Sequence, residues 1–543
     1  VFIRKKWIVT SLVALLVVTL ITGCGSKSAS KTPEPGEKIL TIAAIVDPGT
    51  GDVQLTTEEC LIPLNIYDRL VEAVTTEPGK SELVPGLAEK WEISPDGKVY
   101  TFHIRKGVKF HNGEELKADD VLYTFDRMLD PKTKALNTDI LDMIDGAKER
   151  MEGQADSTRG MKVIDDYTIE ITLIEPFAPF IACLSTPAGS IYNRKATEAA
   201  GLDFGVKPEL TVGTGPFMLT GWTYNDQVIL SANPDYFRGK PDIDKIVTKI
   251  IPDAETQRMM FEKGELDAFD CDNARSQIPY FLKSEKWKDH IVSGPRVGTY
   301  YYHINQTIKP FDDVRVRRAL QYALDRQLLL ETLYYGTGTI AKGIMAPGLA
   351  GYNPDLPGFP YDKEKAKALL AEAGYPDGFE MQISQIVDNP STLKINEAVQ
   401  AMLAEIGIKV EILQMDEAAW FGTRREGKLP MYHTNWSADF NDPDNFIYTF
   451  FATKNTVARS FNYGNKHVQA ELERARTMIV PEERYALYRE LEETIVYEDA
   501  AWIPLFHLNH LFVVQPRVKN FKVSWNGWSN MPYYAVRIDN SWS

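Results

Sequence analysis

The sequence predicts an α/β protein with two lobes, each built around a β-sheet of its own. Three observations lead to this fold class. The chain has 543 residues, which is enough for two or three domains. Segments with the alternation of strands and segments with helical periodicity follow one another along the chain. There is no internal repeat and no coiled-coil heptad pattern, so mixed α/β units in a chain of this length favour two lobes.

The strands and helices of the first half are predicted from local patterns. Residues 39–46 are an apolar run closed by an Asp-Pro-Gly turn, which predicts a buried strand. Residues 98–104 alternate with period two, as a half-buried strand does. Residues 118–129 place apolar side chains on one face behind two aspartates, which predicts a helix.

The second half repeats this mixture of elements. The sequence predicts amphipathic helices at 314–330, 362–373 and 393–406. Glycine follows each of the last two helices and ends them, because glycine readily adopts the left-handed conformation of a helix C-terminus. A strand at 408–413 follows the third helix directly.

The first residues of the chain predict export. A basic segment at 4–6 precedes an uncharged apolar run at 7–22, then Gly23 and Cys24. The apolar run is shorter than the ~20 residues that span a bilayer, which disfavours a transmembrane anchor. Residues 21–24 resemble the lipobox of bacterial lipoproteins, which implies a lipidated Cys24 as the new N-terminus. We therefore expect a signal peptide at 1–23 and a flexible linker at 24–37. A chance cysteine behind an uncleaved helix is the alternative.

The composition predicts that the rest of the chain is a soluble protein attached to that anchor. Hydrophobic residues make up 44% of the chain and charged residues 25%, and no second apolar run reaches membrane-spanning length. The formal net charge of −15 disfavours nucleic acid and anionic membrane as partners. The negative charge is compatible with cationic or zwitterionic small ligands. Much of this charge serves to keep the protein soluble. Cys60, Cys183 and Cys271 leave room for one disulfide outside the cytoplasm, and the sequence does not select the pair.

No motif of the sequence predicts an enzyme. The chain contains no HExxH, no GxSxG and no P-loop, and two Gly-Thr-Gly segments lack the third glycine of a dinucleotide loop. The acidic segment 439–444 fails as a calcium loop, because Pro443 occupies a ligand position. We expect no metal and no cofactor. An extracellular hydrolase is the rival from another class.

Several blocks of the sequence, in order, resemble one family. They are similar to family 5 of the extracellular solute-binding proteins, the oligopeptide, dipeptide and nickel receptors of bacterial ABC importers. The blocks that carry the resemblance are 88–131 (AEKWEISPDGKVYTFHIRKGVKFHNGEELKADDVLYTFDRMLDP), 213–219 with 233–239, 305–326, 361–380 and 435–446 (NWSADFNDPDNF). The resemblance runs from about residue 40 to the end of the chain.

The resemblance implies a periplasmic-binding-protein-like fold of the class II type, with two lobes that close over a ligand. An extra subdomain sits in the first lobe, and two strands form the hinge, near 297–305 and 501–509. The implied divisions are lobe I at 38–70, 209–295 and 509–543, the extra subdomain at 71–208, and lobe II at 296–508.

The implied function is that of a substrate-binding lipoprotein, not an enzyme. It would capture short peptides longer than dipeptides in the interlobe cleft by hinge closure, and deliver them to the membrane permease. We expect a monomer outside the cytoplasm, held to the outer face of the cytoplasmic membrane by its lipid alone. Receptors for sugars, opines or nickel chelates are the alternatives within the family.

The block at 435–446 holds the main expected site residues. Asp439 matches the aspartate that binds the ligand's α-ammonium in the family, and Trp436 matches a pocket-lining tryptophan. Asn435 precedes them in the same block. The alternatives are a turn or cap role for Asp439 and core packing for Trp436.

The other expected contacts come from both lobes. Arg424 and His433 fall where oligopeptide receptors of the family place cations for the ligand carboxylate, although a histidine is mostly neutral at pH 7. An exposed helix end is the alternative for Arg424. The segment 385–390 carries no cation, which argues against a strict dipeptide receptor. The loop 47–54 is expected to approach the ligand.

Four side chains complete the expected set. Asp52 and Val53 belong to the loop of the first lobe. Phe506 and His507 belong to the last crossing between the lobes and are expected to face the cleft.

Overall fold

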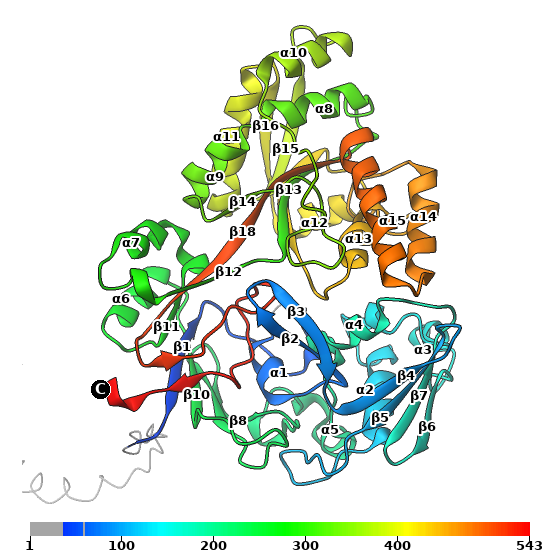
Figure 1. Cartoon of the computed structure of the whole chain (residues 1–543), viewed down its shortest axis with the longest axis vertical. Helices are drawn as coiled ribbons and strands as arrows, with labels where there is room; N and C mark the ends of the chain where they lie inside the picture. Colours follow the sequence, from blue (N-terminus) through cyan, green and yellow to red (C-terminus); the bar gives the residue numbers. More distant parts are fainter. Residues whose placement is uncertain (1–35, 58–59, 543) are drawn as a thin grey trace, which may run out of the picture. The chain divides into compact units, whose positions relative to one another are not determined.

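The structure of the chain, a computed structural model, describes residues 36–57 and 60–542 (Figure 1). The predicted signal peptide and the predicted lipidation site Cys24 lie outside the described residues, as does most of the predicted linker. The described residues from Lys38 onward contact one another as a single unit. Among the described residues, no helix is both long enough and apolar enough to cross a bilayer.

A mixed four-stranded sheet forms the centre of the first lobe. Leu40 and Ile42 alternate with less buried neighbours, so one face of the first strand packs into a core, to which residues 512–538 near the end of the chain also contribute. The strand order is β1-β10-β9-β8, with β1 parallel to β10 and the other pairs antiparallel. The strands are β1 (Ile39–Ala44), β8 (Phe217–Thr223), β9 (Gln227–Ala232) and β10 (Lys245–Ile250).

A second, antiparallel sheet has a separate core, whose residues lie between 70 and 191 except for Phe440. Its strand order is β4-β5-β7-β6, and a two-stranded hairpin precedes it. Its elements are the hairpin β2 (Val71–Glu77) and β3 (Lys80–Pro85), the strands β4 (Ala88–Ile93), β5 (Val99–Ile104), β6 (Met161–Asp165) and β7 (Thr168–Thr172), and the helix α2 (Ala118–Leu129).

One long strand connects the two lobes. β18 (Trp502–Val514) is buried at every residue except Asn509, as a strand covered on both faces should be. Its first residues pair with β13 and β14, and its last residues pair with β11 and β12 (Figure 1). The other strands of this sheet are β11 (Ala268–Asp270), β12 (Ile291–Pro295), β13 (Gly298–Ile304), β14 (Gly338–Ile340) and β17 (Met431–Ser437).

The chain therefore passes between the lobes along neighbouring strands. Trp502, at the start of β18, belongs to a core of the second lobe, whereas Val514, at its end, belongs to the core around Leu40. The β12–β13 segment crosses beside β18, because both of its strands pair with β18. Two adjacent strands at a crossing are a suitable hinge, since few backbone angles need to change.

Helices surround the second lobe's strands (Figure 1). The parallel pair β15 (Glu380–Ile386) and β16 (Lys409–Met415) is connected by α11 (Pro390–Ala404). The other helices of this lobe are α8 (Val314–Ala323), α9 (Arg326–Tyr334), α10 (Lys363–Glu372), α12 (Glu417–Arg425), α13 (Ile447–Phe451), α14 (Lys466–Thr477) and α15 (Pro481–Glu493).

The remaining described elements are short. The α-helices are α1 (Leu61–Ile66), α3 (Ala147–Met151), α4 (Phe180–Leu184), α5 (Arg194–Ala200), α6 (Ala254–Glu262) and α7 (Ile278–Lys283). A last strand pair is β19 (Val518–Lys519) with β20 (Arg537–Ile538).

The prediction of one helix at 314–330 is wrong, because the structure has two. Leu324 is extended, with ψ of 117°, and the Asp325 carboxylate accepts the Leu328 N–H as the N-cap of α9. Arg326 is buried and its Nε donates to the carbonyl oxygen of Pro504 on β18, at 2.6 Å. Apolar periodicity runs through this break, so the cap and the contact with β18 decide it.

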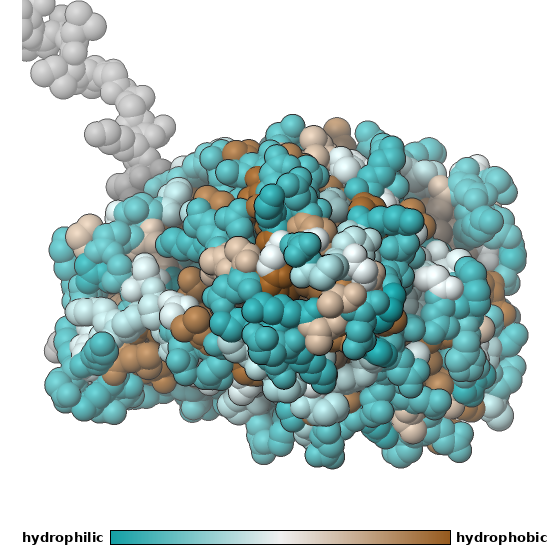
Figure 2. Space-filling view, turned by 90° about the horizontal axis from the view of Figure 1, so that it is seen from above, coloured by the Kyte–Doolittle hydropathy of each residue, from teal (hydrophilic) through white to brown (hydrophobic). Residues whose placement is uncertain are grey.

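Hydrophilic residues cover most of the face seen in Figure 2, and hydrophobic residues form small separate groups on it. This surface agrees with the net charge of −15. On that face, no broad apolar area marks a permanent protein interface.

Candidate functional site

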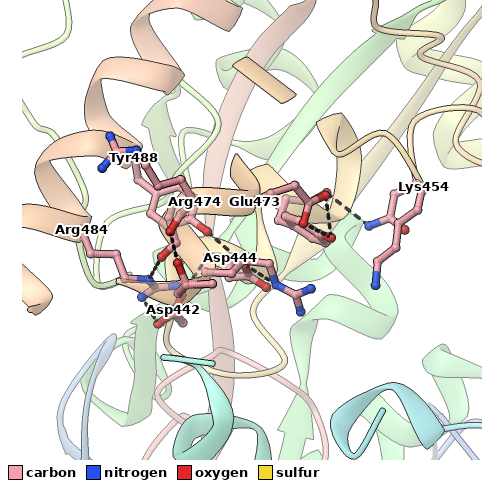
Figure 3. A network of polar contacts seen from close by, with 12 residues as sticks. Asp442, Asp444, Lys454, Glu473, Arg474, Arg484 and Tyr488 are labelled. Carbon is pink, nitrogen blue, oxygen red and sulfur yellow. Dashed lines mark hydrogen bonds and ion pairs between the residues drawn. The ribbon is translucent and has the colours of Figure 1, made fainter. Parts of the chain in front are cut away.

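A loop rich in carboxylates follows β17, and most of its charges are paired inside the protein. Asp442 accepts two hydrogen bonds of 2.7 Å from the guanidinium of Arg484, which is buried on α15 (Figure 3). Asp444 lies 3.2 Å from Arg476 and accepts the hydroxyl of Tyr488 at 3.0 Å. These carboxylates hold the loop against α14 and α15.

Asp439 differs from its neighbours because no cation forms an ion pair with it among the described residues. Its Oδ2 accepts the side-chain amide of Asn445 at 2.9 Å, and its N–H donates to Asn445 Oδ1 at 3.0 Å. Burial raises the pKa of this carboxyl group to about 6, because the Asn445 hydrogen bond and the charge of Arg459 offset only a fraction of the lost hydration.

A cavity of about 460 Å³, which we call the aromatic cavity, opens beside Asp439. This is a usual volume for a small-molecule site. The hairpin β2–β3 contributes Glu72, whose carboxylate forms a buried ion pair with Arg69. Aromatic side chains from the end of the chain line another wall: Phe521, Trp525, Trp528, Tyr533 and Tyr534. The cavity therefore offers apolar faces next to two carboxylates that form no ion pair among the described residues, Asp439 and Asp68. Both oxygens of Asp68 are already used, because they accept the hydroxyl groups of Tyr236 at 2.8 Å and Thr214 at 2.9 Å.

Asn445 lines a second cavity, of about 340 Å³, which we call the charged cavity. Its wall includes three cations, Lys454, Arg459 and Arg476, and three carboxylates, Asp139, Asp142 and Asp444. Asn445 lines this cavity and bonds to Asp439, which lines the aromatic cavity. The two cavities are thus linked through this pair of residues.

The strand β17 is the last strand of its sheet. Asn435 on this strand is exposed, and the neighbouring Trp436 is half-buried. The Trp436 indole N–H donates to the Asn445 carbonyl oxygen at 2.8 Å, which fixes the ring next to the Asp439 loop. An edge strand presents backbone N–H and C=O groups that an extended ligand can pair with.

The two cations expected from the sequence have different environments. His433 is buried against Tyr300 and Tyr302, and neither ring nitrogen has a hydrogen-bond partner among the described residues. Burial lowers the pKa of His433 to about 3, so the ring is neutral and supplies no charge for a carboxylate. Arg424 is half-buried, and its guanidinium lies 4.9 Å from the ring centroid of Phe421.

Two expected contacts of the first lobe have partners inside the protein. Asp52 is buried, accepts Arg127 Nη2 at 2.6 Å and accepts the hydroxyl of Tyr192 at 2.8 Å. Val53 is packed in the core of the first lobe. The expectation that this loop contacts a ligand relied on its glycines, but both oxygens of Asp52 are already used.

Phe506 and His507, expected to face the cleft, also lie in the interior. Phe506 packs 5.0 Å from Tyr334 in a core of the second lobe. His507 is buried, with Nδ1 3.1 Å from the carbonyl oxygen of Gly298, and burial lowers its pKa to about 4. Neither side chain lines the two cavities described above.

Sequence reasoning missed Arg459 and the aromatic wall. Arg459 lines the charged cavity, and its guanidinium lies 4.6 Å from the Trp436 ring centroid. No local pattern marks this arginine, because its surroundings come from distant segments. The density of aromatic residues at 521–534 is the one local signal in the sequence for this wall.

The fold and the site together define a class of protein. Two lobes joined by adjacent strands can close around a small molecule, and a solute-sized cavity lies beside an uncompensated carboxylate. This is the arrangement of a hinged binding protein that holds a small solute.

Comparisons with known proteins place the chain within this class. The model of the bacterial extracellular solute-binding proteins, family 5, matches residues 82–457. The chain is 34% identical over 491 residues to heme-binding protein A of Haemophilus influenzae, covering 87% of each. It is 33% identical over 485 residues to the dipeptide-binding protein of Escherichia coli, covering 86% of this chain and 87% of that protein. The chain therefore belongs to family 5 of the bacterial extracellular solute-binding proteins.

Solved structures agree with this membership. The periplasmic binding protein DppA of Helicobacter pylori, in complex with the peptide STSA, has a TM-score of 0.75 at 30% identity. That match covers 92% of this chain and 98% of DppA. HbpA2 of Haemophilus parasuis has a TM-score of 0.79 at 30% identity, covering 93% of this chain and all of that one.

Proposed function

We propose that this protein captures short peptides and delivers them to the permease of an ABC importer. The observation that carries the proposal is the uncompensated carboxylate of Asp439 at the wall of the aromatic cavity. An α-ammonium group would neutralise this charge and form a charge-assisted hydrogen bond. The neighbouring aspartates cannot take this role, because Arg484 and Arg476 already pair with them.

Other groups near Asp439 suit the rest of a peptide. The edge strand β17 offers backbone groups around Asn435 for pairing with an extended chain. Arg459 offers a guanidinium for a carboxylate and replaces the neutral His433 in our proposed site. Arg424 is a second cation that follows from the family resemblance. The aromatic cavity has room for a ligand side chain.

The names of the relatives support a peptide-like ligand. One relative is a dipeptide-binding protein, another is a glutathione-binding protein from Salmonella that is 33% identical over 469 residues, and the Helicobacter pylori structure holds the peptide STSA. That peptide has four residues, which favours our prediction of ligands longer than dipeptides.

We further propose that the mature protein is a monomeric lipoprotein outside the cytoplasm. A lipid on Cys24 and the linker that follows would hold the receptor near its permease. The support is the lipobox-like segment at 21–24. Metabolic labelling with a fatty-acid probe tests it: the wild-type chain should carry the label and Cys24→Ala should not.

The first prediction concerns the ammonium site. Asp439→Asn keeps the shape of the side chain but removes its charge, so affinity for a tripeptide should fall by roughly 30-fold or more. N-acetylation of the tripeptide should cause a similar loss in the wild-type protein and little further loss in the variant. Isothermal titration calorimetry measures both, and chromatography of the recovered ligand checks that the peptide is not hydrolysed.

The exposed Asp377→Asn is the matched control, since it removes the same charge from the surface of the same lobe. It should bind like the wild-type protein. Undiminished peptide affinity in Asp439→Asn would refute the ammonium site. Preferential binding of sugars, opines or nickel chelates would replace the peptide assignment, and turnover of the peptide would favour a hydrolase.

A further inference from the structure

Two arginines near the proposed site have no anionic partner among the described residues. Arg424 and Arg459 form no ion pair and donate no side-chain hydrogen bond among the residues that the structure describes. Their neighbours behave differently, since Arg484 binds Asp442 at 2.7 Å and Arg476 lies 3.2 Å from Asp444. The chain therefore neutralises some arginines of this lobe and leaves these two uncompensated.

The two arginines belong to neighbouring segments. The Ser460 hydroxyl donates to the carbonyl oxygen of Arg424 at 2.8 Å, which joins the end of α12 to the segment that carries Arg459. The Tyr432 hydroxyl donates to the carbonyl oxygen of Arg459, also at 2.8 Å. Burial lowers the pKa of Arg424, and the positive charge of Arg459 acts in the same direction. Two like charges in a half-buried place are unfavourable unless an anion joins them.

Aromatic rings hold both guanidinium groups. Arg459 lies 4.6 Å from the ring centroid of Trp436 and 5.0 Å from that of Phe450. Arg424 lies 4.9 Å from the ring centroid of Phe421 and 5.4 Å from that of Trp420. Stacking on a ring uses the face of a guanidinium and leaves the N–H groups at its edge available for a carboxylate.

The carboxylates nearby do not neutralise the charges of Arg424 and Arg459. In the charged cavity, Asp142 lies 3.8 Å from Lys454. Burial raises the pKa of Asp139, and the nearby cations oppose this shift. Of the two cations, Lys454 lowers the pKa of Asp139 more than Arg459 does. The remaining carboxylate, Asp439, faces the ammonium in our proposed function. A peptide with a single carboxylate therefore leaves one of the two arginines uncompensated.

We propose that Arg424 and Arg459 form a two-guanidinium site that selects acidic peptides, with one ammonium and two carboxylates in the ligand. This inference rests on the proposed function, because it takes the ammonium at Asp439 as given. One arginine would bind the terminal carboxylate and the other the acidic side chain. Each contact is a charge-assisted hydrogen bond, and a bidentate one where the geometry allows.

Peptide pairs that differ only in charge test the selection. Ala-Glu-Ala against Ala-Gln-Ala, and Ala-Ala-Glu against Ala-Ala-Gln, have nearly the same shape. Calorimetry should show at least one Glu peptide binding the wild-type protein tenfold or more tightly than its Gln partner. Arg424→Gln and Arg459→Gln should each reduce that ratio several-fold toward one. Arg459→Lys should keep some of it, because the charge remains.

The exposed Arg425→Gln is the control, since it removes the same charge from the adjacent position. Its Glu-to-Gln ratio should equal that of the wild type. Equal binding of Glu and Gln peptides by the wild-type protein would overturn the proposal, and so would an unchanged ratio in both arginine variants.

Failure of the proposed function has a different signature. In that case, peptide affinity does not change on N-acetylation of the peptide or in Asp439→Asn. The ratio of the affinities for the Glu and Gln peptides still tests the two arginines. If no peptide of either pair binds, both proposals are refuted. Thermal melting of each variant separates loss of binding from loss of folding.

Discussion

Asp439, Asp442 and Asp444 share one loop but differ in what faces them. Arg484 and Arg476 neutralise the last two, whereas Asp439 meets only the amide of Asn445. A buried carboxylate without a cation is costly for the free protein and becomes favourable when a cation arrives. At the scale of single residues, the partner of each carboxylate therefore separates a structural role from a binding role.

Peptide affinity should depend on pH through Asp439. The pKa of its carboxyl group is raised to about 6 by burial, so the group loses its charge as the pH falls through that value. Between pH 7 and pH 5 the ionised fraction decreases about tenfold, and affinity for an ammonium ligand should decrease by a similar factor. Calorimetry with one tripeptide at both pH values measures this change.

Asp439→Asn should abolish most of this pH dependence, because its side chain does not titrate. Affinity that is equal at both pH values in the wild-type protein would show that the bound ammonium does not face this carboxylate.

At the scale of elements, the loop after β17 is positioned by two helices. Arg484 on α15 donates two hydrogen bonds to Asp442, and its Nε donates to the carbonyl oxygen of Ala475 on α14, at 2.9 Å. One buried side chain thus joins α14, α15 and the loop that carries Asp439 (Figure 3). The rigidity of the proposed site depends on this network.

Breaking this network should destabilise the protein strongly. Arg484→Met keeps most of the apolar volume but leaves the buried Asp442 charge without its cation, which costs about 3–5 kcal/mol of the free energy of unfolding. Urea denaturation followed by circular dichroism measures the change. The double variant Arg484→Met with Asp442→Asn should recover some of the loss. A single variant as stable as the wild type would contradict this account.

At the scale of the whole described unit, β18 is the main connection between the lobes. His510 on this strand is buried, with Nδ1 2.7 Å from the Gly527 carbonyl oxygen and Nε2 2.8 Å from Asp270. Both neighbours are acceptors, so both ring nitrogens carry a proton and the ring is an imidazolium. This charged ring joins β18 to the segment around Gly527, whose neighbours Asn526 and Trp528 line the aromatic cavity.

Stability should fall at high pH through His510. Burial opposes the charged ring, but the carboxylates of Asp270 and Asp272 outweigh it and raise the pKa of His510. A raised histidine pKa stabilises the folded state at pH values below the unfolded pKa, and this contribution disappears as the pH rises through the folded pKa. Urea titrations from neutral to alkaline pH should show the wild type losing stability.

His510→Gln should lack this loss, since glutamine does not titrate. Its stability relative to the wild type should improve as the pH rises. A constant difference between the two proteins over this range would show that the ring is not charged at neutral pH.

Local patterns predicted the bounds of an element well where the element buries one apolar face. The helix expected at 118–129 is α2, with the same bounds, because its apolar face and acidic first turn are local signals. The helix expected at 314–330 is broken, because Arg326 bonds to Pro504, a residue far along the chain. Periodicity reports which residues are buried and does not report a polar contact that interrupts the helix.

The sequence by itself determined the fold class and the family, because ordered blocks such as 88–131 and 435–446 cover most of the chain, and it singled out Asp439. The tertiary structure alone decided which charges are free. Asp52 is used by Arg127, His433 is neutral, and Arg459 lines a cavity. The physical reason is that charge pairing and desolvation depend on groups that are distant in the chain, which only folding brings together.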